Sequence, residues 1–233
     1  MCSRAPPAAA IHLPVARIAA LCLLSAMRAL VLALALFVAL PAAAADLTIS
    51  VRSAAGKPIP DAVVTVYPAA GVPAGPIHFD WPLRMAQHNL QFEPFVLVVP
   101  AGGVVAFPNQ DAVRHHVYSF SPAHPFQLKL YGKDETRTVR FEKPGAIALG
   151  CNIHDQMVSF IKVVDTPYAA KTDAAGEVVL HGVPAGAVSI HVWHPYLKGA
   201  GDDVVRQAAL RANGGRETVT VDVRTVERRS GAY

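Results

Sequence analysis

Short apolar runs that alternate with polar residues, each ended by Gly or Pro, repeat along most of this 233-residue chain. Leu47–Ser53 alternates in this way, and after the turn sequence AGKPIP the next run is Asp61–Ala69. A period of two residues is typical of strands that bury one face, and Gly and Pro mark the turns between strands. Further runs follow in QFEPFVLVVPAGGVVAFP, HHVYSFS, RTVRFEKPGAIALGC and MVSFIKVVD. The pattern predicts an all-β chain with sandwich architecture.

One segment near the C-terminus, VVRQAALRANGGRETVTVDV, has two interpretations. Its Ala, Leu and Arg content permits a helix. The punctuation Asn-Gly-Gly followed by ETVTVDV favours two strands joined as a hairpin, and we expect the hairpin.

The N-terminal 45 residues contain no acidic side chain. From Met27 onwards the sequence has a basic start at Arg28, an apolar stretch, a Pro and the small residues Ala43–Ala45. This layout predicts a secretory signal peptide over residues 1–45, cleaved after Ala45, and therefore a periplasmic protein. An uncleaved membrane anchor is the alternative.

Loss of the leader also changes the charge of the chain. Arg4, Arg17 and Arg28 leave with it, so Lys plus Arg falls from 21 to 18 against 17 Asp plus Glu, and the formal net charge falls from +4 to +1. No cluster of basic residues remains that would indicate nucleic-acid binding.

Cysteine usage gives the sharpest functional bound. Cys2 and Cys22 leave with the predicted leader, so Cys151 has no partner for a disulfide within its own chain. A lone cysteine in an oxidising compartment indicates an intermolecular bridge, a reactive thiol or a metal ligand.

The sequence LGCNIHDQM places Cys151, His154 and Met157 at intervals of three residues. Strand alternation over GAIALGC turns Cys151 to the same inward face as Ile147 and Leu149. Thiolate, imidazole and thioether together suit copper, whereas zinc prefers closed sets of Cys and His. Each residue alone has an ordinary interpretation: a small buried hydrophobe, a loop residue and a core residue. Their joint occurrence around the lone cysteine favours a metal site.

A second histidine would complete a trigonal set of two His and one Cys with a weak axial Met. The sequence FPNQDAVRHHVYSF offers two candidates, His115 and His116. Alternation groups His116 with Tyr118 and Phe120, a more apolar face than that of Val117 and Ser119. The apolar pattern alone therefore favours His116.

The sequences PNQDAVRHHV and CNIHDQM together resemble the ligand pattern of cupredoxins, the blue copper proteins, and the C-x2-H-x2-M spacing is closest to the amicyanin branch. The resemblance covers about Gln91 to Val164. It implies one type 1 copper bound by His115, Cys151, His154 and Met157, with Asn109 and Asp111 at the places of a family Asn and acid. The resemblance selects His115 as the first ligand. A β-bulge that resets the strand alternation would turn this residue inward.

Two positions depart from the family pattern. The family usually has an Asn after the first ligand, where it braces the cysteine loop, and here that residue is His116. Asp155 follows His154 where amicyanins carry Pro, and a carboxylate there would favour the protonated ring and compete with Cu(I).

The flanks resemble the two halves of a transthyretin-like domain of carboxypeptidase regulatory type. The resemblance rests on turn sequences such as GKPIPDAVV, TDAAG and PAG. We therefore expect a cupredoxin domain inserted in a small β-sandwich, whose own histidines, among them His191, are structural or solvated. The expected boundaries are a signal peptide at 1–45, the first flank with a linker at 46–84, a cupredoxin domain at 85–165, the second flank at 166–225 and a flexible tail at 226–233.

The function that this predicts is a one-electron carrier rather than an enzyme, because no further His cluster is present for a second copper centre. Its partners would be redox proteins that dock weakly, at an apolar patch that includes Ile153, Pro125 and Phe126. No nucleic-acid partner is expected, and no membrane association after cleavage. The alternatives are a copper-binding or copper-delivery module, and an adhesion-like β module whose site is incidental.

Overall fold

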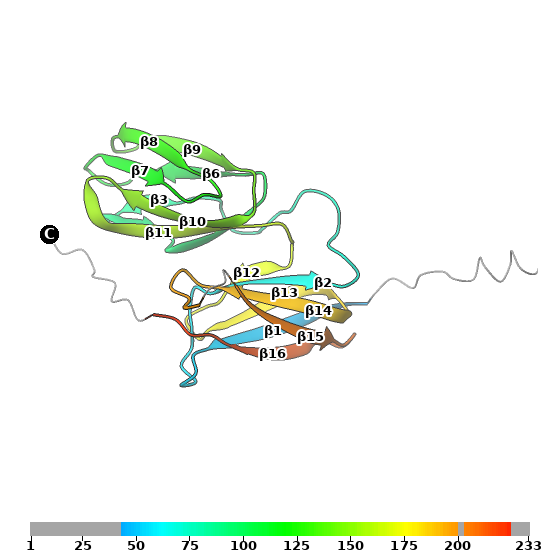
Figure 1. The fold of residues 1–233 in the computed structure, drawn as a ribbon. Helices are drawn as coiled ribbons and strands as arrows, with labels where there is room; N and C mark the ends of the chain where they lie inside the picture. Colours follow the sequence, from blue (N-terminus) through cyan, green and yellow to red (C-terminus); the bar gives the residue numbers. More distant parts are fainter. Residues whose placement is uncertain (1–42, 200–202, 225–233) are drawn as a thin grey trace, which may run out of the picture. The chain divides into compact units, whose positions relative to one another are not determined.

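The computed structural model describes residues 43–199 and 203–224, which form 16 β-strands and no helix (Figure 1). The all-β prediction is confirmed. Within those ranges no helix is long and apolar enough to cross a membrane. Most of the predicted signal peptide and all of the predicted tail lie outside the described residues.

Strands from the two ends of the described chain form two sheets around one hydrophobic core. Their orders are β13-β1-β16 and β12-β2-β14-β15, and β1 has an antiparallel partner in β13 and a parallel partner in β16. Both sheets bury alternate apolar residues in one cluster, among them Ile49, Val66 and Ile190, each 0% exposed. The strands are β1 (Ala44–Arg52), β2 (Val63–Pro68), β12 (Ala169–Lys171), β13 (Glu177–Pro184), β14 (Gly186–Trp193), β15 (Val204–Leu210) and β16 (Gly215–Thr220).

The middle of the chain forms a second core. Its largest sheet has the order β5-β11-β10-β7-β8, and the pairs β6-β9 and β3-β4 complete the set. Phe107, Tyr131, Phe141 and Ile161 are each 0% exposed in this core. The strands are β3 (Ala86–His88), β4 (Gln91–Glu93), β5 (Val96–Pro100), β6 (Gly103–Pro108), β7 (His115–Ser119), β8 (Phe126–Tyr131), β9 (Thr136–Phe141), β10 (Gly145–Cys151) and β11 (His154–Val164).

The first strand begins close to the predicted cleavage point. Ala44 pairs with Pro184 across β1 and β13, and Ala45 is 7% exposed in the core. Cleavage after Ala45 would therefore leave β1 from Asp46 onwards.

The prediction of a hairpin for the C-terminal segment is wrong, but the prediction of two strands there is confirmed. β15 pairs with β14, whereas β16 runs parallel to β1 in the other sheet. A tight turn joins the two strands, with Gly214 at φ 93°. The chain thus crosses from one sheet to the other at this turn, because each strand finds a longer partner there.

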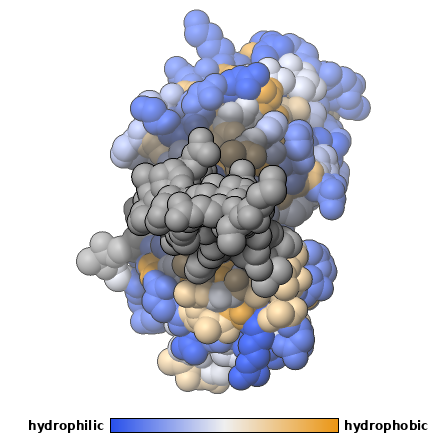
Figure 2. Space-filling model, turned by 90° about the vertical axis from the view of Figure 1, so that its right-hand side faces the viewer, coloured by the Kyte–Doolittle hydropathy of each residue, from blue (hydrophilic) through white to orange (hydrophobic). Residues whose placement is uncertain are grey.

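Hydrophilic residues cover most of the coloured surface in Figure 2, and hydrophobic residues appear in smaller areas. The exposed large apolar side chains include Val113 and Ile153, at 44% and 49%. These two lie beside the site described next.

Candidate metal centre

Cys151 ends β10 with its side chain turned inward, as the alternation predicts. Ile147, Leu149 and Cys151 are 0%, 2% and 4% exposed. A turn follows, and the register then pairs Cys151 with His154, the first residue of β11. The turn brings His154 Nδ1 to 3.5 Å from Cys151 Sγ.

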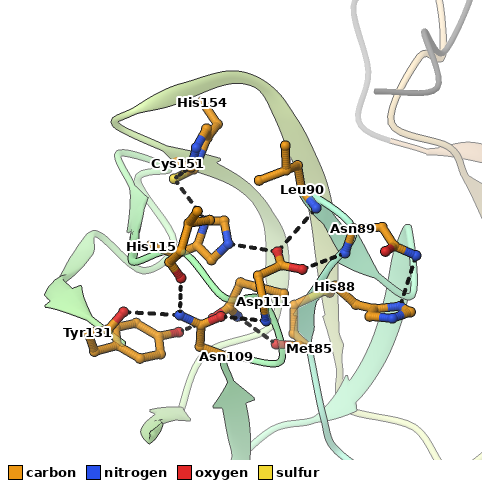
Figure 3. Close-up of polar contacts among 12 residues, drawn as sticks. Met85, His88, Asn89, Leu90, Asn109, Asp111, His115, Tyr131, Cys151 and His154 are labelled. Atoms are coloured by element: carbon orange, nitrogen blue, oxygen red, sulfur yellow. Dashed lines mark hydrogen bonds and ion pairs between the residues drawn. The ribbon is translucent and has the colours of Figure 1, made fainter. Parts of the chain in front are cut away.

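His115 approaches the same sulfur from β7. This strand lies beside β10, with Val117 opposite Cys151. The His115 ring is 0% exposed, and its Nδ1 lies 3.7 Å from Cys151 Sγ. One potential ligand atom from each of His115, Cys151 and His154 lies within 4.8 Å of the others (Figure 3). The structure thus gathers three of the four predicted ligands into one group.

His116 points elsewhere, so the apolar-pattern argument for it is wrong. Its Nε2 lies 2.8 Å from Gln127 Nε2, and its buried Nδ1 has no hydrogen-bond partner among the described residues. The argument failed because Phe120, counted as a core residue, is 82% exposed. The apolar face of β7 is its outer face. A register shift of the kind that the resemblance allowed does occur, between β7 and β8 at residues 115–117.

The main chain of residue 116 contacts the cysteine loop. Its carbonyl accepts a hydrogen bond from Asn152 N at 3.3 Å, and its N–H hydrogen-bonds to Cys151. These contacts brace the loop at the position where the family pattern has an Asn side chain.

Met157, the fourth predicted ligand, is buried on β11. It is 1% exposed and belongs to the same hydrophobic cluster as Cys151 and Val117. The side chain therefore lies in the core that backs the His-Cys-His group.

Asp111 orients the His115 ring, a role that the sequence did not predict. Its Oδ2 lies 2.8 Å from His115 Nε2. A carboxylate on the second ring nitrogen leaves Nδ1 to face the sulfur, as in many metal-binding histidines. Asn109 holds Asp111 in turn, because Asn109 Oδ1 accepts from Asp111 N at 2.9 Å and Asn109 Nδ2 donates to the carbonyls of Val113 and Tyr131.

The turn between β3 and β4 also holds Asp111 (Figure 3). Asn89 N and Leu90 N donate to its two carboxylate oxygens at 2.7 and 3.1 Å. Both turn residues have positive φ, 53° and 56°, as a two-residue hairpin turn of the primed type requires. The spacing N-x-D-x3-H was visible in the sequence, but the turn residues Asn89 and Leu90 lie 22 and 21 residues before Asp111.

These contacts favour a thiolate. Burial alone would raise the pKa of the Cys151 thiol, but hydrogen bonds from the His115 ring, from two backbone N–H groups and from the His154 ring outweigh it and lower that pKa to about 6. The N–H groups are those of His116 and Ile153. The thiolate, not the thiol, is the metal-binding form.

The charges of His115 and Asp111 are coupled to that thiolate. Burial opposes a charge on both side chains. Hydrogen bonds to Cys151 and Asp111 nevertheless raise the pKa of His115. The hydrogen bond to His115, with those from the backbone of Leu90 and Asn89, lowers the pKa of Asp111. The three groups thus favour charge on one another.

A surface hollow adjoins His154. Seven residues line it: Leu90, Val113, Asn152, Ile153, His154, Asp155 and Gln156. Pro125 and Phe126 do not line it, and the Phe126 ring packs on Phe107 and Phe141. Of the three residues expected in a docking patch, only Ile153 is beside His154. The effect of Asp155 on His154 stays a prediction.

Comparison with protein-family models gives no match, and neither does comparison with curated proteins. Among solved structures, a copper-containing nitrite reductase from Thermus scotoductus SA-01 is similar at 27% identity and TM-score 0.35, over 40% of this chain and 25% of that one. A purple cupredoxin from Nitrosopumilus maritimus is similar at 20% identity and TM-score 0.32, over 35% and 98%. A reduced amicyanin mutant is similar at 19% identity and TM-score 0.34, over 45% and 99%. The chain thus spans a quarter of the reductase.

Proposed function

We propose that this chain is a type 1 copper protein of the cupredoxin kind that carries single electrons in the periplasm. The observation that supports it most is the separation of the ligand atoms. Cys151 Sγ lies 3.7 and 3.5 Å from the Nδ1 atoms of His115 and His154. Ligands at about 2.0–2.3 Å from one ion, at trigonal or tetrahedral angles, lie about 3.5–3.8 Å apart. Both sulfur–nitrogen separations therefore fit ligands of one ion, and the two nitrogens lie within 4.8 Å of each other.

The donor set favours copper over zinc. A thiolate and two imidazoles with a buried thioether nearby, Met157, match the ligand types of blue copper sites, where the thioether is a weak axial ligand. Copper held there would accept and release one electron. The chain's own residues supply the thiolate, keep the His115 ring oriented through Asp111, and exclude water from Cys151.

Burial of the ligands supports a carrier over a delivery module. His115 is 0% and Cys151 4% exposed, so an ion held by them is not readily passed to an acceptor. His154 is the half-buried member of the group and lines the surface hollow with Ile153 and Val113. We propose that redox partners dock weakly at this hollow and exchange electrons through His154.

The location and the flanks belong to the same proposal. Export to the periplasm rests on the leader pattern of residues 1–45 and on the unpaired Cys151. The transthyretin-like interpretation of residues 46–84 and 166–225 is supported by a sandwich of three and four strands around one core. We assign this flank no role in electron transfer.

Voltammetry combined with copper competition tests the proposal. A carrier shows a reversible one-electron wave, and a Cu(I) chelator removes its copper slowly. An irreversible wave with rapid loss of copper to the chelator would favour the delivery module and contradict the carrier.

A further inference from the structure

The sheet β12-β2-β14-β15 has one face in the flank core, and its second face carries polar side chains beside the buried Val63 and Trp193 of a separate apolar cluster. On β14, Val188, Ile190 and Val192 point into the core and are 2% exposed or less. Ser189 and His191 alternate with them and so lie together on the opposite face. Neither residue belongs to the candidate metal centre.

Ser189, His191 and Asp203 lie in series, each within contact distance of the next. Ser189 Oγ lies 2.9 Å from His191 Nε2. The other ring nitrogen, His191 Nδ1, lies 3.6 Å from Asp203 Oδ2. This is the order of a hydroxyl, an imidazole and a carboxylate that acyl-transfer enzymes on unrelated folds share, and such groups are recognised by geometry and roles rather than by sequence order. Long contacts of this kind in a free protein often tighten when substrate binds.

Neighbouring residues hold the imidazole and the carboxylate in place. Lys162 Nζ contacts Asp203 Oδ1 at 2.8 Å, which leaves the second carboxylate oxygen toward His191. The Tyr67 ring meets the His191 ring edge-on, with centroids 5.0 Å apart.

An amide donor lies at the hydroxyl. Gln207, opposite Ser189 in the register of β14 and β15, donates from Nε2 to Ser189 Oγ at 3.1 Å. The Ser189 hydroxyl can therefore accept from Gln207 while it donates to His191. An oxygen anion that forms on a carbon bonded to Oγ would lie within reach of the same amide.

We propose that Ser189 is a nucleophile activated by His191, with Asp203 as the positioning residue, and that this face accepts acyl groups from small activated esters. The side chains of His191 and Asp203 are 28% and 23% exposed, so small molecules can reach them. Val205, 52% exposed and opposite His191, offers apolar contact to an aryl or short acyl group.

The reaction balances without a co-reactant other than water. The Ser189 hydroxyl proton passes to His191 Nε2 while Oγ bonds to the acyl carbon. The ester C–O bond then breaks, and the leaving alcohol takes the proton from His191. Water attacks the acyl-serine by the same route, which releases the acid and restores Ser189.

A fluorophosphonate probe on the full chain tests the proposal, since Ser189 Oγ would bond to phosphorus as fluoride leaves. We expect a stable adduct that mass spectrometry locates at Ser189, and release of nitrophenol from p-nitrophenyl acetate. Ser189→Ala should lose both. His191→Ala should slow labelling about 100-fold, the scale of general-base catalysis. Asp203→Asn should slow it too, and Asp203→Glu should recover part of the rate.

Ser53→Ala is the matched control, because the Ser53 hydroxyl accepts a backbone N–H bond in a turn and should not affect labelling. Circular dichroism verifies that each variant is folded. Absence of an adduct at Ser189 in the folded wild-type chain overturns the proposal. An equal labelling rate in folded His191→Ala does so as well, since the serine would then react without its base.

Discussion

The thiol of Cys151 is the side chain whose charge depends most on its neighbours. In the metal-free chain we expect it to ionise with an apparent pKa of about 6, against an ordinary value of 9.0. The ultraviolet absorbance of the thiolate, measured against pH with Cys151→Ser as the baseline, checks this. Titration near pH 9 would contradict the contacts described for the sulfur.

The same shift has a consequence for stability. Because the folded pKa lies below the unfolded one, the thiolate's contribution to the free energy of unfolding is complete above about pH 9 and is lost as pH falls through about 6. The raised pKa of His115 acts in the opposite direction, so the thiolate titration, rather than the unfolding curve, isolates Cys151.

Asp111 gives a second prediction at the residue scale. Asp111→Asn keeps the shape of the side chain but removes the negative charge beside His115 Nε2. We expect copper affinity to fall about 10–100-fold. Competition with a chromogenic Cu(I) chelator measures it. Glu142→Gln is the control, since Glu142 is 64% exposed in a surface pair with Arg140. Equal affinity in Asp111→Asn and wild type would show that Asp111 does not support the ligand.

The residue scale also shows what sequence reasoning can and cannot supply. Spacing was enough to group Cys151 with His154, because a turn of two residues between paired strands fixes their distance. Spacing could not predict the hydrogen bond from Leu90 N to Asp111, because that contact depends on where a separate hairpin packs. It interpreted His191 as structural or solvated and could not place Asp203 beside it, since the two meet across neighbouring strands.

At the scale of elements, one turn of the flank sandwich should tolerate no side chain. Gly176 has φ 69°, and a Cβ there would meet Val51 O at 2.7 Å and Ile59 N at 2.8 Å. Gly182 has the same φ, 69°, but nothing within 4 Å. Ala at either position incurs about 1–2 kcal/mol for the left-handed backbone. Gly176→Ala should lose about 1–3 kcal/mol more from crowding.

Chemical denaturation of the two variants measures that difference. A larger loss of unfolding free energy in Gly176→Ala than in Gly182→Ala is the expected result. Equal losses would mean that the backbone around Gly176 is not packed as described.

Strand existence was easier to predict than strand partners. The runs that became β1 and β10 alternate most clearly, because their buried residues lie mainly on one face. The predicted partners of β15 and β16 were wrong. The turn sequence Asn-Gly-Gly indicates that the chain reverses direction, but it does not indicate that the chain passes to another sheet. Tyr118 and the following Phe120 misled the choice of histidine for a related reason, because the sequence alone does not distinguish an exposed Phe from a buried one, and Phe120 is 82% exposed.

At the scale of the whole molecule, the described chain has two large cores and a smaller third cluster that includes Val63, Val96 and Trp193. β1 and β2 share one core with β12–β16, and β3–β11 form the other. The pairing of β1 with β13 and β16 joins residues far apart in sequence, which periodicity alone cannot assign. The resemblance of the two flanks to one module was the observation that anticipated it.

The visible spectrum of the copper-loaded protein tests the central claim most directly. A type 1 site predicts an intense Cu(II)–thiolate charge-transfer band that persists in His116→Ala and disappears in Cys151→Ser. His115→Ala should lose or strongly alter it. A wild-type protein that binds Cu(II) without this band, or a Cys151→Ser variant that keeps it, would contradict the account.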